Sequence, residues 1–192
     1  MYYIGVDLGG TNIATAVVNE KFEIVGKASI PTNAPRPGEE IAKDIAKSVD
    51  LAIENAGVNK DEVASIGIGS PGAVNAEDGV IEFAGNLGFN HVPLVEYVEK
   101  YTGKKAFVEN DANAAAYGEL IAGAGRGAKN FVAITLGTGV GGGISKEKDN
   151  LLNPINEYVN KYKFGKTAKK QTKIKIAELG NDAGIIGAAF LE

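Results

Sequence analysis

The sequence lacks several ingredients that whole classes of protein require. Its 192 residues include no cysteine and one histidine. Disulfides, Cys-ligated zinc and thiol catalysis are therefore excluded, and so is a metal site built from several histidines. No run approaches the roughly 20 consecutive apolar residues of a membrane span. We expect no zinc and no membrane partner.

The start of the chain and its charge narrow the function further. The first residues, MYYIGVDLGG, have neither the basic region nor the apolar core of a signal peptide, so we expect a cytoplasmic protein. With 24 acidic and 20 basic residues, the formal net charge is −4, which gives no support for a nucleic-acid partner. A hydrophobic content of 44% and a charged content of 23% are typical of soluble globular domains.

Hydrophobic periodicity predicts an α/β fold with a mixed sheet. Three short β-rich runs, at 2–6, 13–18 and 22–30, are separated by turn residues and predict an antiparallel meander. From residue 39 the period changes to 3.6, which predicts a helix that ends at Gly57. Further strands are expected at 63–69, 106–109, 131–136, 140–144 and 172–179, and further helices at 93–101, 112–122, 150–162 and 183–191.

The first segment with chemical character is 7–12, which reads DLGGTN directly after a predicted strand. Two glycines at a strand end allow a turn that exposes backbone N–H groups to an anion, and Thr11 adds a hydroxyl donor. Asp7 has the chemistry to hold Mg²⁺ through water. A plain hairpin turn is the alternative interpretation.

The second segment, 135–143, reads TLGTGVGGG and contains a formal G-x-G-x-x-G pattern. A dinucleotide-binding fingerprint requires a helix to begin at that point, and Val140 with the glycine run disfavours helix. A glycine hairpin that lets a phosphate approach the backbone fits better. A glycine-rich linker is the alternative.

The third segment, 109–116, reads ENDANAAA and places Asp111 where a strand stops and a helix starts. A carboxylate at this position either caps the helix or points into a cleft, where it accepts a proton from a hydroxyl as phosphoryl transfer begins. Both roles can coexist.

Two weaker segments complete the candidate site. Asn86 lies between Gly85 and Leu87, in a loop that suits hydrogen bonds to sugar hydroxyls, although a turn is the simpler interpretation. Gly184 lies in a run of small residues that suits either close helix packing or the approach of a flat base. His91 is expected to be structural or exposed.

Taken together, these segments resemble the ROK family of sugar kinases, within the hexokinase and actin-like ATPase superfamily. The sequence DLGGTN looks like the first phosphate loop of the family, TLGTGVGGG like its second, and ENDANAAA like the segment with the catalytic base. The segments SPG at 70–72 and GNL at 85–87 match the sugar-side loops, and ELGNDAGIIGAA at 178–189 matches the segment near the adenosine. The matches follow the family order along nearly the whole chain.

The resemblance implies an actin-like ATPase (ribonuclease H-like) fold with a complete first domain, 1–120 plus a C-terminal helix at 182–192, and a truncated second domain, 121–181. It implies phosphorylation of a hexose by ATP, glucose to glucose 6-phosphate in the first instance, with Mg²⁺ required. The implied catalytic base is Asp111, and Asp7 orients the metal through water. The implied nucleotide-binding residues are Asp7, Gly9, Gly10, Thr11, Asn12, Thr135, Gly137, Thr138, Gly139 and Gly184, and the implied substrate-binding residues are Gly72, Asn86, Asn110 and Asp111.

The chain departs from the family pattern after Ile144. Family members continue their GTGVGGG loop with a sugar-binding Glu and His segment and a His/Cys zinc motif, whereas here Gly143-Ile144-Ser145 is followed directly by KEKDN at 146–150. Our hypothesis is that an internal stretch is missing, with one GGGIS sequence serving both sides of the junction. The loss is expected to expose apolar faces, so we expect self-association into a homo-oligomer or partial disorder.

Three other functions stay open on the sequence. An internally deleted kinase that only binds nucleotide or sugar weakly is one, because the family's Glu and His sugar ligands are absent. A kinase for an N-acylated hexosamine is the second. A sugar-responsive repressor is disfavoured, because such family members carry a helix-turn-helix before the first strand, and here the strand begins at Tyr2.

Overall fold

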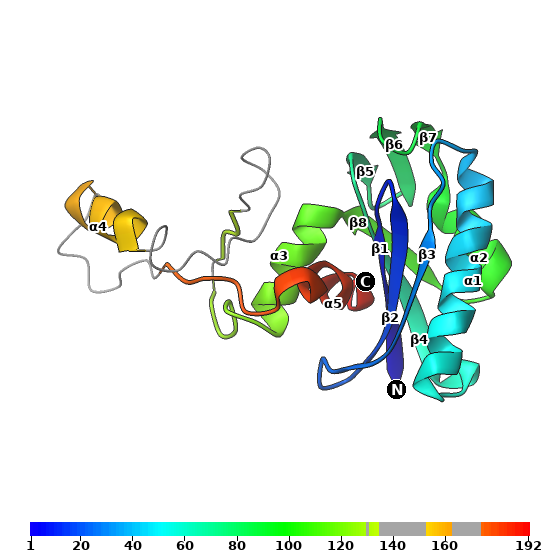
Figure 1. Cartoon of the computed structure of the whole chain (residues 1–192), viewed down its shortest axis with the longest axis horizontal. Coiled ribbons are helices and arrows are strands. Elements are labelled where there is room, and N and C mark those ends of the chain that lie inside the picture. The colour runs from blue at the N-terminus through cyan, green and yellow to red at the C-terminus, as the bar shows by residue number, and fades with distance from the viewer. Residues whose placement is uncertain (130, 135–152, 163–173) are drawn as a thin grey trace.

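The fold centres on a five-stranded mixed sheet (Figure 1). The computed structural model describes residues 1–129, 131–134, 153–162 and 174–192. The strands are β1 (Tyr2–Leu8), β2 (Asn12–Asn19), β3 (Ile24–Pro31), β4 (Val63–Ser70) and β8 (Ala106–Asn110). Their order is β3-β2-β1-β4-β8, in which β1, β2 and β3 form an antiparallel meander and β4 and β8 continue parallel to β1. The predicted meander and mixed sheet are confirmed.

One face of this sheet is covered by α1 (Gly38–Ala56) and α2 (Leu94–Thr102) (Figure 1). The apolar stripe of α1 is buried against the sheet, as its 3.6-residue period predicts. Gly57 follows with φ 65° and donates its N–H to the carbonyl of Glu54, so the predicted C-terminal stop is a left-handed cap.

The opposite face is covered by α3 (Asp111–Ile121) and α5 (Ala183–Ala189), which also pack against each other. Glycines make these contacts close enough to bring backbone against backbone. A Cβ on Gly67 would overlap the carbonyl of Ala188, and a Cβ on Gly187 would overlap the carbonyl of Ala114. Residues near the C-terminus are therefore an integral part of the sheet's second face.

A second, three-stranded sheet was not predicted from the sequence. It contains β5 (Ala73–Asn75), β6 (Val80–Ala84) and β7 (Phe89–Val92) in the order β5-β6-β7. The strands have only three to five residues and alternate too briefly to give a clear period of two. Phe89 and Leu87 are fully buried in the main core, which anchors this sheet to the rest of the molecule.

Two predicted strands are wrong where the structure describes them. Residues 131–134, expected in a strand at 131–136, lie outside any strand, and so do residues 174–179, expected in a strand at 172–179. Val132 and Ile134 are 84% and 74% exposed. β-rich composition makes a strand only where a neighbouring strand accepts its hydrogen bonds, and the expected partner at 140–144 lies outside the described residues.

The other predicted helices are found with small shifts at their ends. The helix predicted at 150–162 is described as α4 (Asn153–Tyr162), and residues 150–152 lie outside the described part. The helix predicted at 183–191 stops at Ala189. Short 3-10 turns, η1 (Lys60–Glu62) and η3 (Gly180–Asp182), precede β4 and α5. None of the described helices has the length and apolar character needed to cross a membrane.

Candidate active site

The candidate site lies at the edge of the sheet where three parallel strands end. Because β1, β4 and β8 run parallel, their carboxyl ends lie together, and the register aligns Asp7 with Gly69 and Gly69 with Glu109. Asp111 follows two residues later, as the first residue of α3. Residues from three separate sequence segments, Asp7 and Asp111 among them, therefore lie at one edge of the sheet.

Asp7 and Asp111 interact electrostatically across this edge. Burial raises the pKa of Asp7, and the negative charge of Asp111 raises it further. Gly69 lies next to Asp7 in the sheet, and the position of a Cβ on Gly69 is 3.6 Å from Cα of Asp111. Gly69 therefore packs directly against the start of α3.

Asn110, and not Asp111, is the N-cap of α3. Its side-chain oxygen accepts hydrogen bonds from the backbone N–H groups of Ala112 (3.0 Å) and Asn113 (3.3 Å). The extended backbone of Asn110 suits the cap, whereas Asp111 is already helical. The capping interpretation of Asp111 is corrected accordingly. Its carboxylate is exposed and accepts a bond from the N–H of Ala112 (2.8 Å).

The predicted sugar-side residue Gly72 is tied to the same edge. Its carbonyl accepts a hydrogen bond from the side-chain amide of Asn110 (3.0 Å). Its φ of 94° lies in the region that favours glycine, and a Cβ there would overlap the carbonyl of Phe83. Asn110 therefore uses its side chain to join the turn at Gly72 to the start of α3, which leaves one amide N–H for a ligand.

The predicted phosphate loop is a tight turn between β1 and β2. The N–H of Gly9 donates to the carbonyl of Asn12 (2.9 Å), and Thr11 and Asn12 are exposed. Gly10 lies against Asn86: the position of a Cβ on Gly10 is 3.3 Å from Nδ2 of Asn86. The glycine turn and the GNL loop are therefore neighbours in space, although the segments DLGGTN and GNL begin 78 residues apart in the sequence (85 − 7).

Sequence reasoning missed the residue that braces this turn. Thr32 is fully buried; its hydroxyl donates to the carbonyl of Gly9 (2.7 Å), and its N–H donates to the carbonyl of Thr11 (2.8 Å). In the sequence, Thr32 lies in the proline-rich segment 31–38, which reads as an ordinary loop. No pattern in that segment marks Thr32.

Arg36 connects Thr32 to α1. Its guanidinium donates to the carbonyl of Thr32 (2.6 and 3.0 Å) and forms an ion pair with Asp44 (2.6 Å). The chain of contacts from Asp44 through Arg36 and Thr32 to Gly9 connects a rigid helix to the glycine turn. Such support limits the freedom of the backbone N–H groups that would face a phosphate.

Not all predicted nucleotide-binding residues are described. Thr135, Gly137, Thr138 and Gly139 lie outside the described residues. Gly184 is on α5, and nothing lies within 4 Å of the position of a Cβ there. Close helix packing, one of the two roles considered for the small-residue segment, belongs to Gly187 and not to Gly184.

The carboxylate pair suits magnesium bound together with phosphates. Mg²⁺ keeps several waters and takes one or two protein carboxylates when it is held with a nucleotide. Asp7 and Asp111 supply that donor set. Among the described residues, no group of three or more His, Cys, Asp or Glu side chains is arranged to hold a metal by itself.

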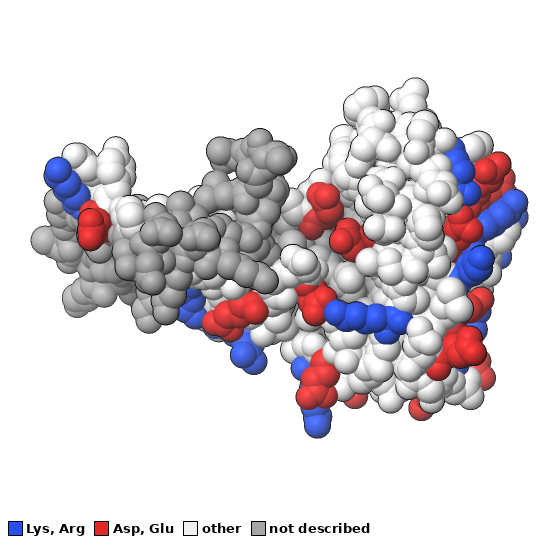
Figure 2. Space-filling view, viewed as in Figure 1, with Lys and Arg blue, Asp and Glu red and all other residues white. Residues whose placement is uncertain are grey.

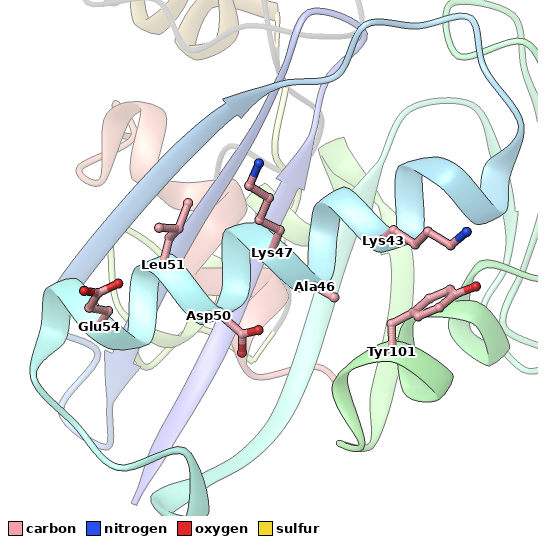
Figure 3. Close-up of a pocket in the computed structure, with 7 residues that line it drawn as sticks. All are labelled: Lys43, Ala46, Lys47, Asp50, Leu51, Glu54 and Tyr101. Atoms are coloured by element: carbon pink, nitrogen blue, oxygen red, sulfur yellow. The ribbon is translucent and has the colours of Figure 1, made fainter.

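A pocket between α1 and α2 is separate from the candidate site (Figure 3). Acidic and basic side chains line it together, among them Lys43, Asp50 and Glu54. Charges of both signs mix along this side of the molecule (Figure 2), and several are paired, such as Lys60 with Asp50 (2.8 Å). Nothing in the pocket selects a ligand of one charge.

Comparisons with known proteins identify the family to which the sequence is similar. A sequence model of the ROK family matches residues 3–148. A glucokinase of Halalkalibacterium halodurans is 43% identical over 155 residues, which are 81% of this chain and 47% of the relative. An N-acetyl-D-glucosamine kinase of Haemophilus influenzae is 35% identical over 144 residues, which are 74% of this chain and 45% of the relative. The chain thus spans less than half the length of these curated relatives.

Solved structures give the same result for the fold. A ROK family glucokinase from Streptomyces griseus, in complex with glucose and AMPPNP, is 41% identical with a TM-score of 0.64, over 73% of this chain and 43% of that one. An inorganic polyphosphate/ATP-glucomannokinase from Arthrobacter, 24% identical, has a TM-score of 0.71 over 98% of this chain and 96% of that one. The fold is that of the actin-like ATPases, and the chain belongs to the ROK family.

Proposed function

We propose that the chain transfers the γ-phosphoryl group of ATP to a hydroxyl of a hexose, with glucose as the first substrate to test. The observation that carries the proposal is the edge at which Asp111 faces Asp7, beside the glycine turn and the loop of Asn86. The glucokinase relatives support it. Phosphoryl transfer requires mainly positioning and charge stabilisation, together with a base for the attacking hydroxyl.

In this proposal Asp111 accepts the proton of the sugar hydroxyl, and its exposed carboxylate is open to a substrate. Backbone N–H groups of the turn at 9–12 and the hydroxyl of Thr11 surround the phosphates. Bound Mg²⁺, oriented by Asp7 through water, would neutralise phosphate charge. Four residues outside the described part, and one on α5, complete the nucleotide site: Thr135, Gly137, Thr138, Gly139 and Gly184. Gly72, Asn86 and Asn110 contact the sugar.

The proposal includes a division of the chain into two domains. Residues 1–120 with 182–192 form the first, which carries the described edge, and residues 121–181 form a shortened second domain. We propose a cytoplasmic protein that self-associates, and no zinc site. We propose that an internal stretch is missing after Ile144, where the sequence departs from the family pattern.

An assay of ADP release with ATP, Mg²⁺ and a panel of hexoses tests the function. We expect sugar-dependent turnover that falls at least about 100-fold in Asp111→Asn, because general-base catalysis contributes about 10²–10⁴-fold. Asp61→Asn, an exposed carboxylate in η1, is the matched control and should leave turnover unchanged. Turnover that persists in Asp111→Asn would overturn the assignment of the base.

A second function is favoured by the length of the chain. The chain spans less than half of its curated relatives, and the Glu and His sugar ligands implied by the family resemblance do not follow its glycine loop. Each lost hydrogen bond to a sugar costs about 1 kcal/mol. The alternative is therefore a chain that binds nucleotide or sugar weakly without turnover. Calorimetric titration with ATP and with glucose separates the two cases, since binding without ADP release supports the alternative.

The sugar itself has a specific competitor. The Haemophilus influenzae relative is named as a kinase of N-acetyl-D-glucosamine, so an N-acylated hexosamine belongs in the panel. Faster turnover with N-acetylglucosamine than with glucose would favour that substrate.

A further inference from the structure

Glu119 is a buried acidic residue that the proposed chemistry does not use. It lies in the last turn of α3 and is 3% exposed. Its carboxylate accepts three backbone hydrogen bonds: Oε2 from the N–H of Ala124 (2.8 Å) and of Glu178 (3.1 Å), and Oε1 from the N–H of Leu179 (2.7 Å). All three donors come from outside helices and strands.

These donors belong to two segments that are far apart in the sequence. Ala124 lies where the chain leaves α3, and Glu178 and Leu179 lie where it returns toward α5, in the orange stretch of Figure 1. A single carboxylate therefore joins the beginning and the end of the 53-residue excursion 125–177 (177 − 125 + 1). Lys175 adds a second link, because its Nζ donates to the carbonyl of Ala124 (2.7 Å).

The backbone near Glu119 also holds the outgoing segment close to the end of α3. Its own carbonyl accepts hydrogen bonds from the N–H groups of Gly123 (3.2 Å) and Gly125 (2.8 Å), so the outgoing segment is held at both the backbone and the side chain. A Cβ on Gly123 would overlap the carboxylate of Glu119. Only glycine leaves the space that the carboxylate occupies.

An acidic residue at this place carries a cost. Negative charge is unfavourable near the C-terminal end of a helix, and a buried carboxylate without hydrogen-bond partners is costly. An apolar side chain of similar size at position 119 would fill the same space without this cost. Three N–H donors on one carboxylate compensate the charge, which indicates that the hydrogen bonds are the reason for the residue.

We propose that Glu119 is a positioning residue that ties the outgoing segment at Ala124 to the returning segment at Glu178 and Leu179, and holds both against α3, the helix that begins with Asp111. The inference deepens the proposed function and rests on it, because the predicted second phosphate loop at 135–139 lies between these two segments in the sequence. Glu119 acts through the segments it holds and contacts no substrate.

Amide hydrogen exchange of the full chain without substrate tests the tie. Glu119→Gln keeps the shape but offers one acceptor oxygen, and it turns an amide N–H toward a backbone donor. We expect exchange at Ala124, Glu178 and Leu179 to become about tenfold faster or more, with no change in β1 and β4. Glu178→Gln is the matched control, because its side chain is exposed and its backbone N–H is retained.

Unchanged exchange in Glu119→Gln, or a uniform rise that includes β1 and β4, would overturn the proposal. The wild-type chain provides a test without any variant, since Glu178 and Leu179 must be protected although they lie in no helix or strand. Unprotected amides at both positions would also overturn it.

Steady-state kinetics then separate this inference from the proposed function. For Glu119→Gln we expect a KM for ATP that is raised about tenfold or more, with a smaller change in kcat, because uniform binding is lost while Asp111 is intact. A wild-type chain without turnover would contradict the proposed kinase and leave the exchange result to decide on the tie. A changed kcat with an unchanged KM for ATP would contradict the positioning role.

Discussion

Folding favours the protonated carboxyl of Asp7, whereas metal binding would use the charged carboxylate. Its pKa is raised above the ordinary value of 3.8 by burial and by the charge of Asp111, so the folded chain binds this proton more tightly than the unfolded chain does. Stability is therefore lost as the pH rises through the window that begins at the ordinary value and ends at the raised one. At neutral pH the folded state carries the cost of the charge.

Asp7→Asn removes this cost. We expect the free energy of unfolding of this variant to exceed that of the wild type at neutral pH. The difference should vanish as the pH falls below 3.8, where Asp7 of the wild type is protonated in both the folded and the unfolded chain. Urea denaturation across this pH range measures the effect. A variant that is less stable than the wild type at neutral pH would show that the charge of Asp7 is favourable without a ligand.

The hydroxyl of Thr32 offers a second test at the level of one residue. Thr32→Val keeps the shape and removes the hydrogen bond to the carbonyl of Gly9. We expect a loss of about 1 kcal/mol in the free energy of unfolding, since the part-buried carbonyl of Gly9 is left without this partner. We also expect weaker binding of nucleotide, because the glycine turn loses its support. Urea denaturation and titration with a fluorescent ATP analogue measure the two effects.

Thr102→Val is the matched control for this variant. Thr102 is also buried, and its hydroxyl donates to the carbonyl of Val98 (2.8 Å) in α2, away from the turn. Its stability should fall by a similar amount, with the affinity for nucleotide unchanged. Equal affinities in the Thr32 and Thr102 variants would argue against the brace.

Among the elements, α5 depends on glycine at one position and tolerates it at another. A Cβ on Gly187 would overlap the carbonyl of Ala114 and lie 2.6 Å from the amide nitrogen of Gly118, whereas nothing lies near a Cβ on Gly184. We expect Gly187→Ala to lose at least about 2 kcal/mol of stability, because backbone atoms must move. Gly184→Ala should gain up to about 1 kcal/mol from helix propensity.

Chemical denaturation of the two variants, three positions apart on one helix, measures this difference directly. A Gly184→Ala variant that keeps its stability but binds ATP more weakly would support an adenine contact at Gly184. Equal losses of stability in both variants would contradict the packing of α5 described here.

Elements with a strong local period were predictable, and elements that depend on distant partners were not. The 19-residue helix α1 shows five turns of an apolar stripe and a glycine stop, so its sequence alone specifies it. The sheet of β5, β6 and β7 and the coil at 131–134 depend on whether a partner strand is present, which no local pattern records. Thr32 and Glu119 escaped notice for the same reason, because their partners lie on other segments.

At the scale of the whole molecule, the two ends of the sequence form one structural unit. α5 packs on β1, β2 and β4, and Ile185 and Ala189 share a buried cluster with Ala16 and Val18 of β2. The cost of closing a loop grows only slowly with its length. The proposed internal deletion can therefore leave this unit intact, because the chain still returns to place α5 on the sheet.

A chain that ends at Asp182 tests this dependence. Without α5, the glycines at positions 5 and 67 and the second face of the sheet lose their cover, and each large apolar side chain that is no longer buried costs about 1.5–3 kcal/mol. We expect the truncated chain to lose cooperative unfolding by circular dichroism, and a peptide of residues 174–192 added in trans to restore it. A truncated chain that unfolds cooperatively by itself would show that the sheet and α1 suffice, and that the C-terminal residues are an accessory layer.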